Sequence, residues 1–105
     1  MKNLTAFFVL GVGLFLTHSA TAQSGADTYT SKCQMCHAAD GSGNSPAGKA
    51  MKTPSLLAPE TVGKSDADLI ALTKNGKAKM PAYAGKLTDS QIKDVVTYIR
   101  TLQKK

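Results

Sequence analysis

The residues of this chain best suited to chemistry are two cysteines and a histidine in one short run. Cys33 and Cys36 lie three positions apart, and His37 follows at once. This Cys-x-x-Cys-His pattern is typical of a c-type haem attachment site. Each thiol can add to one haem vinyl group, while the adjacent imidazole can bind the iron from one face. The sequence therefore predicts one covalently attached haem with His37 as an iron ligand.

Three other uses of the same residues are open. A zinc site would want four ligands, whereas the chain beyond its leader offers Cys33, Cys36 and His37 as its only cysteines and histidine. A thioredoxin-like dithiol also uses Cys-x-x-Cys, but we find no βαβ pattern in the sequence. The third possibility is a structural disulfide. The haem interpretation is favoured because it uses all three residues in their order.

The N-terminus indicates the compartment in which this chemistry takes place. Lys2 precedes an apolar run over 4–16, and Ala20-Thr21-Ala22 is typical of a cleavage site. This pattern predicts a secretory signal peptide over 1–22, too short for a comfortable transmembrane span. An uncleaved anchor is the alternative. We expect a mature domain over 23–105, located in the periplasm and without stable membrane insertion.

The mature domain is small and basic. Removing Lys2 from the 13 Lys and Arg residues leaves 12 basic side chains against 7 acidic ones. A domain of this length has a marginally stable core and usually needs additional stabilisation, which buried haem would supply. The surplus charge concerns partners and solubility. Because no aromatic residues are interleaved with the lysines, nucleic acid is a poor candidate partner.

The residue pattern predicts an all-α domain. One helix is expected over 25–35, with a common face formed by Ala26, Tyr29, Thr30, Cys33, Cys36 and His37. Capping signals place further helices after Ser65 and after Thr88, the first ending at Asn75-Gly76. The last helix carries a 3.6-period apolar stripe of Ile92, Val95, Val96, Ile99 and Leu102. Loops are expected over 40–48 and 77–85, with irregular structure or short turns around Pro59 and Gly63.

A second axial iron ligand must come from a methionine or a lysine, because the mature chain contains no second histidine. Met35 lies between the cysteines, and Met51 follows them too closely to reach the opposite face easily. Met80 comes after a helix, in a loop stiffened by Pro81, and can return to the far face. The sequence therefore favours Met80 as the second metal ligand, with an ordinary core methionine and ligation by Lys79 as alternatives.

With these residues in view, the chain resembles a small bacterial class I c-type cytochrome with one haem. Gly25 and Tyr29 resemble the glycine and the aromatic residue of that family's N-terminal helix. Val95 and Tyr98 resemble the large aliphatic and the aromatic residue of its C-terminal helix, and in the family these four residues pack where the two helices cross. The resemblance implies a cytochrome c fold. In this fold the N- and C-terminal helices cross, while short helices and loops wrap around covalently bound haem c.

The resemblance also implies roles for other residues of the cofactor-binding site. Pro54 and Leu56 match the family's Pro-x-Leu run, whose proline carbonyl accepts a hydrogen bond from the ligand histidine. Lys79-Met80-Pro81 is similar to the family's methionine loop. The chain departs from the family in having no tryptophan and one arginine, Arg100. The family often places such residues near a haem propionate, so the propionate partners are left open.

The implied function is one-electron transfer and not catalysis by an enzyme. His37 and Met80 would keep the iron six-coordinate as it cycles between Fe(II) and Fe(III), while the protein passes electrons between respiratory or other redox partners. The alternative is an open-site haem peroxidase or ligand sensor in which Met80 is not bound. We expect a monomer whose partners dock through acidic surfaces. The lysines near the haem edge would be Lys49, Lys52, Lys74, Lys77, Lys79 and Lys86.

Overall fold

The computed structural model describes residues 24–105, and the predicted leader over 1–22 lies outside this range. Residues 24–105 are mainly helical, and the β-bridges among them are isolated pairs that build no strand. The predicted all-α class is therefore confirmed. None of the helices within 24–105 is long and apolar enough to cross a membrane. In chain order the helices are α1 (Gly25–Thr28), the π-helix η1 (Tyr29–Cys33), α2 (Gln34–His37), α3 (Pro46–Met51), α4 (Pro59–Val62), α5 (Asp66–Asn75) and α6 (Asp89–Gln103).

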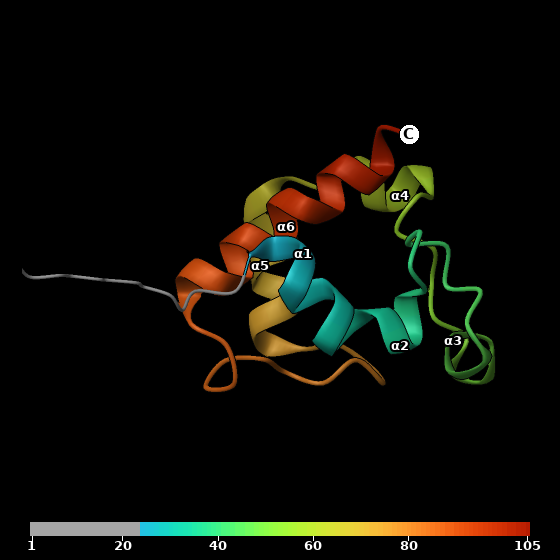
Figure 1. The fold of residues 1–105 in the computed structure, drawn as a ribbon, viewed down its shortest axis with the longest axis horizontal. Coiled ribbons are helices and arrows are strands. Elements are labelled where there is room, and N and C mark those ends of the chain that lie inside the picture. The colour runs from blue at the N-terminus through green and yellow to red at the C-terminus, as the bar shows by residue number, and fades with distance from the viewer. Residues whose placement is uncertain (1–23) are drawn as a thin grey trace, which may run out of the picture.

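The first and last helices cross and form the main packing contact of the fold. In Figure 1, α1 lies against the middle of the long helix α6, and α5 packs against α6 as well. Gly25 sits where the two backbones meet. A Cβ atom there would lie 2.3 Å from the carbonyl oxygen of Asp94 and 3.1 Å from Cβ of Tyr98. The crossing therefore requires glycine at this position, because any side chain would push the helices apart.

The core forms around the crossing. Tyr29 is 1% exposed and packs with Val95, Ile99 and Leu102, and its ring centroid lies 5.3 Å from that of Tyr98. The packing inferred from the family resemblance is thus confirmed. The whole apolar stripe predicted on the last helix is buried, as its 3.6-residue period requires.

The predicted helix boundaries after Ser65 and Thr88 are confirmed. Ser65 Oγ accepts a hydrogen bond from the Asp68 amide at 3.0 Å, and helix α5 ends at Asn75. Thr88 forms a full capping box with Gln91 at the start of α6. Gly76 follows α5 with φ of +76°, a conformation that favours glycine. These helix ends depend on residues that are close together in the sequence, so the sequence predicts them.

The N-terminal helix differs from its prediction in two respects. It continues to His37, and its middle turn over Tyr29–Cys33 is a π-helix. A π turn takes more residues than an α turn, so it rotates the side chains that follow it relative to those before it. The predicted common face is wrong: Thr28 and Tyr29 are buried, whereas Ala26 and Thr30 are exposed.

The loop predicted over 40–48 is also partly wrong, because its last residues begin helix α3. Ser45 Oγ accepts a hydrogen bond from the Gly48 amide at 2.9 Å, and Pro46 occupies the first turn. A serine cap followed by proline is a known start signal for a helix. The Gly- and Ser-rich stretch before it concealed this signal. Met51 consequently lies on a helix and not in a loop.

Arg100 fastens α6 to the segment between α4 and α5. Its Nε donates to Asp66 Oδ1 at 2.8 Å, and Nη1 donates to the Val62 carbonyl at 3.3 Å. Nη2 donates to the Lys64 carbonyl, while Nη1 also reaches Gln103 Oε1 at 2.9 Å. Because these bonds engage all three nitrogens of the guanidinium, Arg100 acts as a structural clamp beside the C-terminal end of α6.

Candidate haem site

A cavity of about 650 Å³ lies beneath the helix crossing, and it contains the residues singled out from the sequence. Its lining is mostly apolar and comes from segments far apart in the chain. The predicted site residues Cys33, Cys36, His37, Pro54, Leu56 and Met80 all line it. The structure therefore brings the complete predicted set together in one place. Apolar walls are added by Leu69, Leu72, Val95 and Ile99.

The two cysteines are free and half-buried at one side of this cavity. The η1–α2 junction sets their spacing, since Cys33 ends the π turn and Cys36 lies one turn later. Burial raises the pKa of the Cys33 thiol to about 11, so this thiol stays protonated at neutral pH. A neutral thiol suits the apolar cavity better than a thiolate would.

The chain turns sharply after His37. Ala38 has φ of +68°, a left-handed conformation that alanine rarely adopts. Its carbonyl accepts a hydrogen bond from the Tyr29 hydroxyl at 2.5 Å, and its amide donates to the Gln34 carbonyl at 2.9 Å. The buried Tyr29 thus holds the turn that ends α2. This turn fixes the backbone from which the His37 imidazole projects.

The His37 imidazole is prepared to act as a neutral ligand. Burial lowers its pKa, because the charged imidazolium loses its hydration. Its Nδ1 atom is buried and makes no hydrogen bond within residues 24–105. Pro54 lines the same cavity, but the hydrogen bond between its carbonyl and His37 that the family resemblance implied is not formed in this structure. A buried ring nitrogen without a hydrogen-bond partner destabilises the folded protein.

Met80 approaches the cavity from the segment between α5 and α6, in the loop predicted over 77–85. The Met80 amide donates to the Lys77 carbonyl at 2.9 Å, and the Lys77 amide donates to the Met80 carbonyl at 3.0 Å. The Tyr83 amide ties the loop to the Thr73 carbonyl at 3.0 Å. The Tyr83 hydroxyl also donates to the Lys32 carbonyl at 3.0 Å. The loop is therefore anchored both to α5 and to the turn before Cys33.

The other mature methionines differ in their relation to the cavity. Met35 is 75% exposed and does not line the cavity. Met51 does line the cavity from α3, although it is 45% exposed. Met80 is more buried than Met51. The structure thus leaves Met80 and Met51 as the methionines beside the cavity.

The lysines that line this cavity differ in part from the predicted set. Of the predicted set, Lys52, Lys77 and Lys79 line the cavity, whereas Lys49, Lys74 and Lys86 do not. The ammonium of Lys74 pairs with Asp89 at 3.3 Å. Sequence reasoning missed Lys32 and Lys64, which also line the cavity. Lys32 could have been found from its place next to Cys33, but Lys64 is brought in by tertiary packing.

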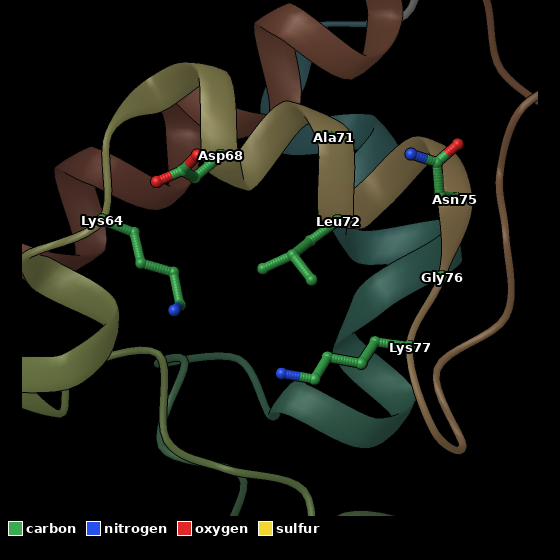
Figure 2. A pocket seen from close by; sticks show the side chains of 7 residues that line it. All are labelled: Lys64, Asp68, Ala71, Leu72, Asn75, Gly76 and Lys77. Atoms are coloured by element: carbon green, nitrogen blue, oxygen red, sulfur yellow. The ribbon is translucent and has the colours of Figure 1, made fainter.

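A second hollow of about 330 Å³ adjoins the first along α5 (Figure 2). It is lined by Lys64, Asp68, Ala71, Leu72, Asn75, Gly76 and Lys77. Three of these, Lys64, Leu72 and Lys77, line the large cavity as well. The border between the two hollows therefore carries two cationic side chains and one apolar one.

These features fit a covalently bound haem. The apolar lining suits a porphyrin ring, and the neighbouring thiols suit thioether attachment. The neutral, buried imidazole and the thioether of Met80 are both ligands that iron takes in haem proteins. The unpartnered Nδ1 of His37 shows that the polar contacts of this imidazole are incomplete without a bound group.

Comparison with known proteins decides the family. Residues 20–99 match the family described as "Cytochrome C oxidase, cbb3-type, subunit III". The chain is also 34% identical to cytochrome c6 of Nostoc sp., over 94% of this chain and 92% of that protein. This chain belongs to the class I c-type cytochromes. A second relative, cytochrome c6 of Gracilaria tenuistipitata, is 31% identical to this chain, over 94% of this chain and 93% of that protein.

Solved structures agree with this assignment. The cytochrome is similar to the KustC0563 c-type cytochrome, with a TM-score of 0.68, 25% identity, and coverage of 77% of this chain and 99% of that one. Cytochrome c6 of the diatom Phaeodactylum tricornutum has a TM-score of 0.60 at 24% identity, which supports the fold. The predicted cytochrome c fold is confirmed. The cytochrome is an electron-transfer protein and not an enzyme, and it carries one covalently bound c-type haem.

Proposed function

We propose that this cytochrome is an exported, six-coordinate electron carrier in which His37 and Met80 bind the haem iron from opposite faces. The main support is that both side chains line one cavity with Cys33 and Cys36, although Met80 comes from a separate segment. Bound haem supplies a one-electron iron couple. The leader pattern over 1–22 supports export to the periplasm.

In this proposal the residues of the cavity have separate roles in binding the haem. Cys33 and Cys36 hold the cofactor, so that it stays in place whatever the state of the iron. His37 binds as the neutral imidazole that its burial favours. Met80 contributes a neutral thioether, which favours the reduced iron and raises the reduction potential. Pro54 accepts a hydrogen bond from Nδ1 of His37 once the imidazole is ligated, and Leu56 packs beside it.

The anchored methionine loop explains how such a carrier would transfer electrons rapidly. Two hydrogen bonds of 3.0 Å hold the loop, one from the Tyr83 amide to the Thr73 carbonyl of α5 and one from the Tyr83 hydroxyl to the Lys32 carbonyl. A ligand held in this way keeps its position when the iron changes oxidation state. Little must then reorganise during transfer.

The carrier proposal is tested by the optical and redox behaviour of protein matured with its haem. We expect a single reversible one-electron transition and, in the ferric protein, the weak far-red band that sulfur ligation of iron produces. The ferrous protein should not bind carbon monoxide at neutral pH, because both axial positions are filled. Rapid carbon monoxide binding by the native protein would instead indicate an open-site sensor or peroxidase.

We further propose that the carrier works as a monomer that docks acidic partners through its lysine-bordered cavity edge. Lys52→Glu/Lys79→Glu should slow second-order electron transfer to an acidic acceptor severalfold at low salt, because a positive edge steers encounter. The wild-type rate should fall as ionic strength rises.

The control is Lys93→Glu/Lys104→Glu, which changes the net charge equally at exposed sites that do not line the cavity. Reduction potentials are measured in parallel to separate docking from driving force. If the two double variants slow transfer equally, net charge and not the cavity edge is responsible. A concentration-independent elution volume at the monomer size tests the oligomeric state.

A further inference from the structure

The border between the two hollows has the composition of a carboxylate-binding site. The large cavity is mostly apolar, whereas the lining of the adjoining hollow along α5 is polar and apolar in nearly equal parts. Lys64 and Lys77 line both, and Leu72 lies between them (Figure 2). A molecule with an apolar body and a negatively charged edge would match this change from apolar to cationic surroundings.

The two lysines come from opposite ends of one helix. Lys64 precedes α5 and Lys77 follows it, and Figure 2 shows both side chains reaching into the space below Leu72. The carboxylate of Asp68 and the amide of Asn75, in the same view, do not reach into that space. The side chains that converge there are therefore cationic or apolar.

Neither ammonium group is committed to another partner within residues 24–105. The ion pairs formed there join Lys74 with Asp89 and Arg100 with Asp66. Asp66, one of the two acidic residues in the first turn of α5, is thus already paired, and the other, Asp68, forms no ion pair there. Two ammonium groups that share a space without an anion repel each other, so an anion placed between them would be stabilised.

The backbones that carry the two lysines are fixed in place. Arg100 donates to the carbonyls of Val62 and Lys64, which holds the segment before α5. Lys77 exchanges two backbone hydrogen bonds with Met80, directly after the left-handed Gly76. These bonds also show that Arg100, the one arginine of the sequence, is engaged with protein groups and does not line the cavity.

We propose that Lys64 and Lys77 form a paired cationic site for the propionate carboxylates of the haem. This inference rests on the proposed function, since it requires haem in the large cavity. Haem carries two carboxylates on one edge, and a carboxylate that is taken from water needs a cation or hydrogen-bond donors. The lysine pair fills the role for which this chain has no tryptophan or free arginine.

The variants that test the site are Lys64→Met, Lys77→Met and the double variant. Lys93→Met/Lys104→Met is the control, because it removes equal charge at exposed positions outside both hollows. The measurements are the propionate bending bands in resonance Raman spectra and the paramagnetically shifted propionate methylene protons of the ferric protein. The double variant should shift both signals, each single variant should shift part of them, and the control should leave them unchanged.

A second measurement uses the wild-type holoprotein and needs no variant. Acetylation by a soluble anhydride, followed by peptide mass spectrometry, should modify Lys64 and Lys77 severalfold more slowly than Lys93 and Lys104. An ammonium group in contact with a carboxylate is shielded from the reagent. Equal acetylation rates, or propionate signals in the double variant identical to those of the wild type, would overturn the proposal.

Failure of this inference can be told apart from failure of the proposed function. If the variants retain covalent haem and the far-red sulfur band while the propionate signals do not move, the lysine assignment is wrong and the carrier stands. If the wild-type protein itself lacks that band or lacks covalent haem, the ligation proposal fails before the lysines are tested.

Discussion

Met80→Ala is expected to abolish the far-red charge-transfer band of the ferric protein and to lower its reduction potential. Loss of the thioether removes the neutral donor that favours reduced iron. The vacated position becomes available to outside ligands, so imidazole should bind at least about tenfold more tightly, a gain of about 1.4 kcal/mol. The measurements are ferric absorbance, an imidazole titration and a redox titration.

Met51 provides the matched control, since it is the other methionine that lines the cavity. Met51→Ala should retain the band and the potential, because its side chain is half exposed on α3. Loss of the band in Met51→Ala and its retention in Met80→Ala would reverse the assignment. A variant in which Lys79→Ala alone changes the ferric spectrum would instead identify the neighbouring lysine as the ligand.

Cys33→Ala/Cys36→Ala is expected to leave a protein without covalent haem and without a stable fold. The cavity of about 650 Å³ lies against the crossing of α1 and α6 and shares Val95 and Ile99 with the core around it. An empty apolar cavity costs on the order of 24 cal/mol per Å³. Even a fraction of that cost, for a cavity this large, rivals the ~5–15 kcal/mol that stabilises a typical domain.

Far-ultraviolet circular dichroism during heating checks this prediction. The holoprotein should melt cooperatively, whereas the double variant should show reduced helicity and no sharp transition. Cys36→Ala alone keeps one attachment point and should lie between them, which separates loss of haem from loss of a thiol. Haem that survives denaturation of the wild type confirms covalent attachment. Cooperative melting of the double variant at the holoprotein's temperature would contradict the proposed dependence on haem.

Local sequence signals predicted a large part of the fold and of the site. The serine cap at Ser65 and the capping box at Thr88 are made by residues three positions apart, so both are visible in the sequence. The stripe on α6 is visible because burial repeats with the helical period. The proposed haem anchors are equally local, since Cys33, Cys36 and His37 are neighbours in the chain.

Other features depend on contacts between distant segments. The π turn in η1 changes which side chains face α6, and no local signal in the sequence announced it. The predicted ring of lysines was only half correct, because exposure to the cavity depends on how α3, α5 and the methionine loop pack. Lys64 reaches the cavity through a segment held by Arg100, a residue more than thirty positions away.

The sequence by itself thus determined the cofactor, the residues proposed to anchor it and the helices that flank it. Only the tertiary structure decided which methionines and lysines surround the cavity, and that Arg100 is bonded to protein groups. The physical reason is the range of the interactions. Caps, periodic burial and the Cys-x-x-Cys-His spacing act within one or two helical turns, whereas the walls of the cavity exist only once α1, α5 and α6 have packed together.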